Sequence, residues 1–331
     1  DIFSLSLSEE LSVNDLLLFG ENNFQAKGNR YLKDIQYTDS TFYLLTEFTD
    51  SCDIDGNLRY SFGKTDVLLL KSDLEGTITG SKQLAGFKED EAESLIIDND
   101  TNIYFTTEFE SVIFFDQDST QSAGGKDILL MKTDKYFNTL WYTQIGSNTN
   151  EHADNLLANT VNAVYLSGVF QDSLQIGNKA IVSENMTADM FTAKYSPEGD
   201  NLGLKQAGGS GHEYGNKLIN DKDNYLYIIG NFSYDFAFET DSISSDSIFL
   251  ADNEDIFVAR FYDCDYARYP EIGNDTSYCG YGTLEVLNPE SSGTGLFGSY
   301  RNYYWNNGQR GRQITVYDSA YYYVTTIDVH N

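Results

Sequence analysis

The sequence predicts an all-β fold in which one structural unit is repeated along 331 residues. A phrase that begins with Asp and two apolar residues recurs in steps of 61 to 66 residues, at Asp1, Asp66, Asp127, Asp189 and Asp255. A run of aromatic and β-branched residues keeps a similar step and ends at Phe48, Phe109, Phe170 and Phe232. No helical 3.6-residue periodicity is present. Four short strands in about 61 residues are typical of a propeller blade, so we predict a β-propeller of four-stranded blades.

The clearest copy of the unit predicts four antiparallel strands in order. An inner strand near Glu93–Asp98 leads through a polar turn into a strand over 102–109. A connection of 17 residues, 110–126, follows, and two further strands begin at Asp127 and Leu140. The turn residues are Asn and Asp, which bond their own backbone and tolerate left-handed geometry. We expect each repeated Asp at a strand start to cap its own loop by accepting backbone hydrogen bonds.

The repeat predicts a partial blade and then further blades before a second domain. The predicted segments are 1–19 (partial), 20–86, 87–146, 147–206 and 207–269, followed by a domain over 270–331. Because the first copy lacks inner strands, we expect earlier blades before Asp1; a small closed propeller with an irregular seam is the alternative. After Pro270 the phrase stops, and an Asn-Asn-Gly turn after Trp305 with alternating strands at 313–316 and 322–326 predicts a small Ig-like β-sandwich.

Both parts resemble known families. Strands such as Tyr227–Phe232 and the Gly-rich step Ala207–Gly209 resemble the repeat of bacterial secreted β-propeller proteins. The tail resembles the PKD or Ig-like module of Bacteroidota surface proteins at Ile272–Cys279, Tyr303–Gly308 and Ala320–Val324, although Ala320 stands where that module usually has Gly. The resemblance implies an exported protein of the type IX secretion, gliding motility or adhesion class, located outside the cell or on the bacterial surface.

The net charge of −30, from 51 acidic and 21 basic residues, argues against two classes of partner. Phosphate backbones and anionic membranes attract basic surfaces, so we expect no nucleic acid and no direct membrane insertion. Protein or glycan partners at the cell surface are expected instead. Solubility in a salty medium explains the charge, and structural calcium is the alternative. Its best candidate ligands are Asp50, Asp53 and Asp55, in a loop that lacks the Glu of a full EF-hand; no other cofactor is expected.

The cysteines allow more than one arrangement. A disulfide between Cys264 and Cys279 would close a loop of roughly 15 residues and add about 3 kcal/mol in the chain-entropy model. Cys279 could instead pair with a cysteine beyond Asn331. Cys52 lies far from any histidine of its repeat, which favours a free or buried thiol over a nucleophile.

A channel-mouth site is predicted where the loops enter the inner strands. Its candidate residues are Glu91, His152, His212 and Glu213, as metal ligands or as acid and base, although ordinary solvated loops explain the same residues. No nucleophile or phosphate-binding motif occurs, so no catalytic residue is assigned.

The surface carries two further sets of candidates. The longest connection offers apolar partner-contact residues, Tyr234, Phe236, Phe238, Ile248 and Phe249, which could equally pack under the loop. Resemblance to Bacteroidota exported proteins implies O-glycosylation of serines that follow Asp, at Ser40, Ser119, Ser173, Ser242, Ser247 and Ser319.

These observations together predict a non-enzymatic extracellular binding or scaffold protein of a surface, adhesion, gliding or secretion-associated assembly. Two alternatives stay open. One is a propeller enzyme that acts on polysaccharide or peptide at the channel mouth. The other is a passive spacer in a long adhesin.

Overall fold

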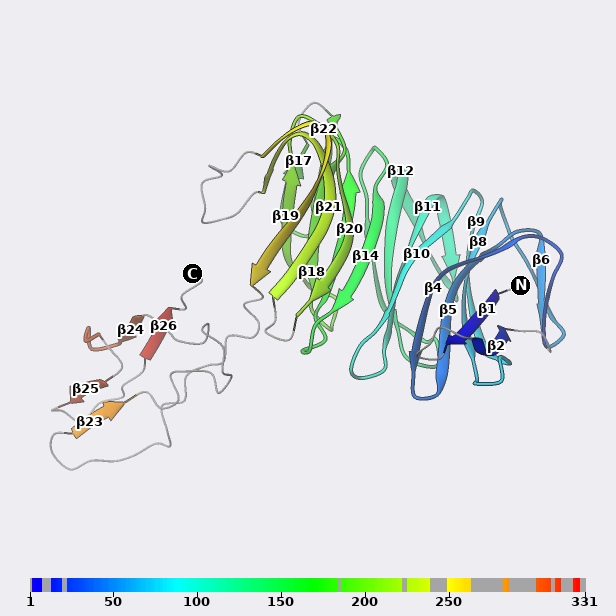
Figure 1. Ribbon diagram of the computed structural model, residues 1–331, viewed down its shortest axis with the longest axis horizontal. Helices are drawn as coiled ribbons and strands as arrows, with labels where there is room; N and C mark the ends of the chain where they lie inside the picture. The colour runs from blue at the N-terminus through cyan, green and yellow to red at the C-terminus, as the bar shows by residue number, and fades with distance from the viewer. Residues whose placement is uncertain are drawn as a thin grey trace. The chain divides into compact units, whose positions relative to one another are not determined.

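The computed structural model describes residues 2–7, 13–19, 23–183, 186–221, 225–238, 249–262, 282–285, 302–310, 313–316 and 324–327. The predicted all-β class is confirmed, because strand accounts for 70% of the structure and the described residues form no α-helix. The sheets are curled and include a half-barrel (Figure 1). Within the same residues no helix is long and apolar enough to span a membrane.

The chain divides into two compact units, residues 1–219 with 227–259 and residues 220–226 with 260–331. The first unit contains three antiparallel four-stranded meanders. The first meander consists of β4 (Arg30–Thr38), β5 (Thr41–Phe48), β8 (Asp66–Ser72) and β9 (Ile78–Gly86). The second consists of β10 (Glu91–Ile97), β11 (Ile103–Phe115), β12 (Asp118–Thr133) and β13 (Thr139–Ile145). The third consists of β14 (His152–Ala158), β15 (Val164–Phe170), β18 (Asp189–Tyr195) and β19 (Asn201–Gly208).

Further strands extend the sheet of the third meander, and shorter sheets accompany the first and third repeats. After the third meander come β20 (Glu213–Asn220), β21 (Tyr225–Phe238) and β22 (Phe249–Tyr262), with β21 paired to β19 and to both others. Before the first meander, β1 (Ile2–Leu7) and β2 (Val13–Phe19) form an antiparallel hairpin. A three-stranded sheet joins β3 (Phe24–Ala26), β6 (Ser51–Ile54) and β7 (Asn57–Tyr60), and a hairpin joins β16 (Ser173–Ile176) and β17 (Lys179–Val182).

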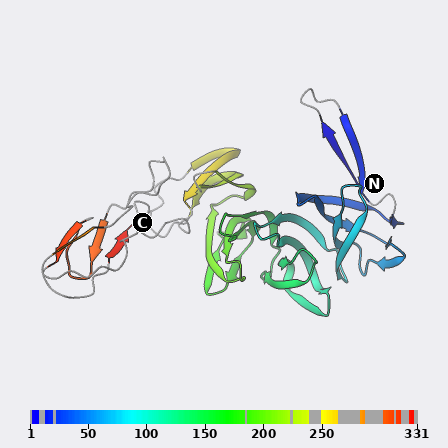
Figure 2. The ribbon, with the colours of Figure 1, turned by 90° about the horizontal axis from the view of Figure 1, so that it is seen from below.

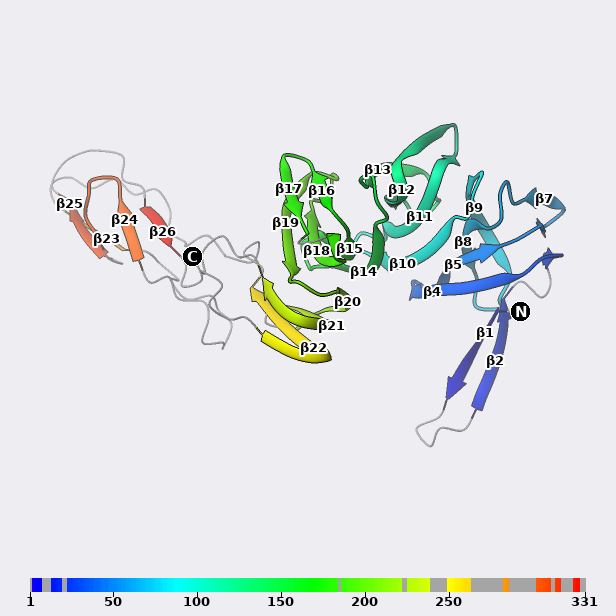
Figure 3. The ribbon, with the colours of Figure 1, turned by 90° about the horizontal axis from the view of Figure 1, so that it is seen from above.

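Consecutive meanders lie beside one another, and a hydrophobic core fills the space between each pair (Figures 2 and 3). On β12, Leu129 packs with residues of the first meander, and its neighbour Leu130 packs with residues of the third. Both side chains are fully buried. Because successive residues of a strand point to opposite faces, a strand buried on both faces carries a continuous apolar run. This is why the repeated phrases read as apolar runs without alternation.

The long connections predicted between the second and third strands of each repeat are β-hairpins. Residues 49–65 contain β6 and β7, residues 171–188 contain β16 and β17, and residues 110–126 continue β11 and β12 beyond the meander. The β6–β7 turn is Asp55–Gly56, with positive φ at both residues, the geometry of a two-residue hairpin turn. The first and third repeats therefore add a second small sheet to their meanders, and the second repeat lengthens two strands of its own meander.

Two of the repeated Asp residues, Asp66 and Asp127, cap their loops as predicted. Asp66 accepts the backbone amide of Phe62 at 3.2 Å, and Asp127 accepts that of Ala123 at 2.9 Å. A glutamine 17 residues further on donates to each of these carboxylates and to the hairpin backbone. The Asp–Gln pairs are Asp66–Gln83, Asp127–Gln144 and Asp189–Gln206. The Asp of the repeated sequence motif and its Gln partner therefore attach each hairpin to its meander.

The described residues of the second unit form two antiparallel two-stranded sheets. One pairs β23 (Gly282–Glu285) with β25 (Gln313–Val316), and the other pairs β24 (Asn302–Trp305) with β26 (Val324–Ile327). Trp305 and Ile314 are buried. After Trp305 the chain turns through Gly308, which has a φ of 83°, and the Trp305 amide bonds the Gln309 carbonyl at 3.0 Å. The predicted Asn-Asn-Gly turn is thus present.

Candidate functional site

A side-chain hydrogen bond of the same kind joins the first strands of successive repeats at each junction, and at the first junction Gln36 also donates to the carbonyl of Leu95 at 2.9 Å. Asp34 on β4 accepts the amide of Leu95 at 2.8 Å. Ser94 on β10 accepts the amide of Leu156 at 3.1 Å, and Asn155 on β14 accepts that of Leu218 at 3.1 Å. The strands β4, β10, β14 and β20 therefore form a series in which polar side chains of one strand hold the backbone of the next.

A second link crosses the same junctions from the neighbouring strand. Glu47 on β5 accepts the amide of Ala92 at 2.9 Å, and Glu108 on β11 accepts the amide of Ala153 at 3.0 Å. Both glutamates are buried, with exposed fractions of 6% and 2%. A buried carboxylate needs such donors to offset its desolvation. Glu108 therefore has a structural role, which it shares with Glu47: it links its meander to the backbone of the next one.

Each first strand also has a register shift, a β-bulge or irregularity, near its start. The shift lies between Leu32 and Asp34 on β4, between Ala92 and Leu95 on β10, and between Ala153 and Asn155 on β14. The residues inside these intervals include Lys33, Glu93 and Asp154. Bulges change the direction of side chains and are frequent next to functional sites. All three repeats thus place a charged residue at the same irregular point.

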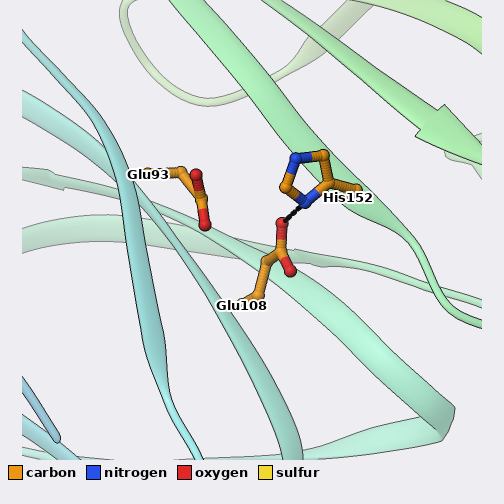
Figure 4. A group of neighbouring side chains, drawn as sticks. All are labelled: Glu93, Glu108 and His152. Atoms are coloured by element: carbon orange, nitrogen blue, oxygen red, sulfur yellow. Dashed lines mark ion pairs between the residues drawn. The ribbon is translucent and has the colours of Figure 1, made fainter. Parts of the chain in front are cut away.

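At the junction of the second and third meanders, Glu93, Glu108 and His152 converge (Figure 4). One ligand atom from each lies within 4.8 Å of the other two. His152 Nδ1 forms an ion pair with Glu108 Oε1, and Nε2 lies 3.8 Å from Asp154 Oδ1. The cluster therefore draws its residues from β10, β11 and β14, and the His152 side chain is half exposed.

The preceding junction has a different set of charges. There Glu47, the counterpart of Glu108, pairs with Lys33 at 3.1 Å. Glu91, which stands opposite Glu108 in the sheet, occupies the position that His152 has in the next repeat and pairs with Lys126 at 2.6 Å. Both acids of this junction therefore have a lysine partner. The acid and histidine cluster is a departure from the repeat and is not explained by it.

The surroundings shift the pKa values of the cluster toward neutral or above. The hydrogen bond to Glu108 raises the pKa of His152 to about 9, against the opposing effect of burial. Burial, followed by the charge of Glu108, raises the pKa of Glu93 to about 7, and burial raises that of Asp154 to about 7. Near neutral pH the imidazole therefore carries a proton, and the two carboxyl groups are poised between their charged and neutral forms.

The four predicted channel-mouth residues do not form one group. His152 joins Glu93 and Glu108, while Glu91 is held by Lys126. His212 is exposed, and its Nδ1 accepts the backbone amide of Ala188 at 3.1 Å. Glu213 is fully buried at the start of β20. Sequence reasoning named His152 and missed the two glutamates that surround it.

The three aspartates predicted for calcium have structural contacts in the hairpin of β6 and β7. Asp53 accepts the amide of Gly56 at 2.6 Å, Asp55 accepts the side-chain amide of Asn23 at 3.1 Å, and the carbonyl of Asp50 accepts the amide of Ser61. Among the described residues, Glu93, Glu108 and His152 are the one group of three with the spacing of metal ligands. The calcium site stays a prediction.

The other predicted site residues are placed in part. Phe236 is buried and stacks on Phe232 and Phe257, so it belongs to the core, whereas Tyr234 is 60% exposed. The side chains of Phe238, Ile248 and Phe249 lie outside the described residues, as do both cysteines of the predicted disulfide, Cys264 and Cys279. Ser40, Ser119 and Ser173 are exposed, and Ser242, Ser247 and Ser319 lie outside the described residues.

Comparison with known proteins adds no assignment. The sequence matches no protein-family model and none of the curated proteins with which it was compared. The site is therefore interpreted from its own geometry.

Proposed function

We propose that the chain is a non-enzymatic binding and scaffold protein of an extracellular bacterial surface assembly, with propeller blades followed by an Ig-like module of PKD type. The observation that carries the proposal is that the meanders share the same hydrogen bonds, whereas the hairpins attached to them differ. The Asp–Gln pairs recur within each repeat and the links between first strands recur at each junction, while the hairpins of β6–β7, β11–β12 and β16–β17 differ in length and sequence. Rigid frames with variable attachments are typical of recognition proteins.

Three features support the blade interpretation. Each meander has four antiparallel strands in sequence order, the first strands of neighbouring meanders are linked side by side, and a core lies between neighbours. Propeller blades have this strand order and pack face to face around an axis. The paired sheets around Trp305 and Ile314 support the Ig-like module, which packs two antiparallel sheets on a shared core. The segment boundaries given above are part of this proposal.

Binding and turnover are separated by one experiment. The purified chain is immobilised and exposed to a panel of bacterial surface polysaccharides and peptides, and bound ligand and reaction products are both measured. We expect saturable binding to a member of the panel with no product. The Glu93, Glu108 and His152 cluster favours the enzyme alternative, which predicts product that is lost in His152→Ala. The absence of saturable binding to any panel member would overturn the proposal in favour of a spacer.

A further inference from the structure

The junction between β10, β11 and β14 has fewer cations than the junction before it. Glu93, Glu108 and Asp154 bring three carboxyl groups around the single imidazole of His152. Two nearby lysines, whose charges also act on Glu93 and Glu108, form their ion pairs with other acids, Lys33 with Glu47 at 3.1 Å and Lys126 with Glu91 at 2.6 Å. A partly buried site that gathers acids around one cation favours a further positive charge.

A second observation is independent of this charge balance. The Asp154 side chain is 10% exposed, and its buried Oδ2 atom makes no well-formed hydrogen bond within the described part of the chain, although the backbone amide of Gly215 stabilises the charged form of the carboxyl group. Burying a carboxylate oxygen without a partner costs about 1–3 kcal/mol, and native structures seldom leave one in this state. The other oxygen, Oδ1, lies 3.8 Å from His152 Nε2, so this incompletely satisfied carboxyl group adjoins the cluster.

We propose that Glu93, Glu108 and His152 bind one divalent transition-metal ion, such as Zn²⁺ or Mn²⁺, with Asp154 as a further carboxylate at the same site. Imidazole suits transition metals, and carboxylates complete such ligand sets, whereas Ca²⁺ and Mg²⁺ take oxygen ligands alone. Metal–ligand bonds of about 2.0–2.2 Å place two ligand atoms at most about 4.3 Å apart. The ligand atoms lie within 4.8 Å of one another, so small side-chain rotations are enough to bring them to that geometry.

The path to the site is open, and the ion would join separate elements. His152 is half exposed, so an ion reaches its ring from solvent. Glu93 and Glu108 belong to the second meander and His152 and Asp154 to the third. A bound ion therefore adds a link between two repeats that already share a core and several hydrogen bonds, among them those of Glu108 with Ala153 and of Ser94 with Leu156. This inference does not depend on the ligand of the proposed surface function.

Titration of the intact chain with Zn²⁺ and Mn²⁺ after treatment with a chelator tests the proposal. We expect one equivalent to bind in calorimetry with a dissociation constant in the micromolar range or tighter, on the order of −8 kcal/mol, and to raise the melting temperature. His152→Ala and Glu93→Gln are each expected to weaken binding by at least about tenfold. Glu93→Gln leaves the backbone links of Glu108 intact, so it keeps the test decisive if His152→Ala fails to fold.

His212→Ala is the matched control, because His212 is an exposed histidine on the following repeat and lies outside the cluster. Its metal affinity and stoichiometry are expected to equal those of the unmodified chain. Three results would overturn the proposal: no saturable binding of either metal, equal weakening by His212→Ala and His152→Ala, or binding of Ca²⁺ in preference to both transition metals. Each is independent of whether the chain binds a glycan or a peptide.

Discussion

The carboxyl group of Asp90 is fully buried immediately before β10, and neither of its oxygens makes a well-formed hydrogen bond within the described residues. Burial, followed by the charge of Asp66, raises its pKa from 3.8 to about 8. Between these two values the folded chain keeps a proton that the unfolded chain has released. The free energy of unfolding therefore falls as pH rises through this window, and the loss is complete above the folded pKa.

Asp90→Asn removes this ionisation. We expect the variant to exceed the unmodified chain in free energy of unfolding by roughly 2 kcal/mol near pH 8, and by much less near pH 4. Denaturant unfolding at the two pH values measures the difference. Glu89→Gln is the control, since Glu89 is an exposed neighbour paired with Lys64, and it should leave the pH slope unchanged. If Asp90→Asn changed the free energy of unfolding by the same amount at both pH values, the raised pKa of Asp90 would be contradicted.

Cys52 is 1% exposed, and burial raises the pKa of its thiol to about 11. Since the thiolate is the reactive form, we expect Cys52 to resist alkylation in the folded chain and to react on unfolding. Mass spectrometry of a Cys264→Ser, Cys279→Ser chain after iodoacetamide treatment reports on Cys52 alone. Complete labelling under native conditions within the time needed for a free peptide thiol would show that the thiol is accessible.

At the scale of single elements, the β6–β7 hairpin depends on its turn. Gly56 has a φ of 79°, and no atom lies within 4 Å of the position that a Cβ would take. In Gly56→Ala the added Cβ would touch no other atom, but the residue would have to adopt a left-handed backbone conformation that is unfavourable for Ala. We therefore expect a loss of about 1 kcal/mol in unfolding free energy. Gly203→Ala is the matched control, because Gly203 has no positive φ and its nearest neighbour, Lys194 Cβ, is 3.9 Å away. Equal losses from both variants would exclude the turn as the cause.

The sequence predicted the meander strands well and the hairpins poorly. Strands such as Asp127–Thr133 lie between two cores, so burial on both faces imposes an apolar run that is visible in the sequence. The continuation of β11 and β12 over 110–126 is paired locally and carries polar residues such as Ser119 and Ser122, which resemble a loop. A signal was available in Asp55–Gly56, a typical two-residue hairpin turn.

The candidate site was harder to predict, because register and bulges are not visible in a single sequence. His152 was identified as a channel-mouth residue, but its partner Glu108 lies 44 positions earlier and reaches it through the pairing of β10, β11 and β14. The Thr-Glu-Phe triplets that contain Glu47 and Glu108 recur 61 residues apart and were a usable signal for an acid at the junction. The column of Gln83, Gln144 and Gln206 was another.

At the scale of the whole molecule, stability comes from cores that lie between repeats. Each meander shares apolar residues with its neighbours, so its stability depends on the adjacent units as well as on its own strands. β12 shows this most clearly, because Leu129 belongs to the core with the first meander and Leu130 to the core with the third. Two adjacent and fully buried residues of one strand therefore support different neighbours.

Leu129→Ala and Leu130→Ala are each expected to cost about 3 kcal/mol, since each leaves a cavity in a closed core. Their hydrogen-exchange patterns should differ. Leu129→Ala should speed amide exchange in β5 and β8 of the first meander, and Leu130→Ala should speed it in β15 and β18 of the third. Each variant serves as the control for the other, because the chemistry, the strand and the burial are the same. Identical exchange patterns would mean that the first unit opens as a single cooperative block, and the nearest-neighbour account of its stability would be wrong.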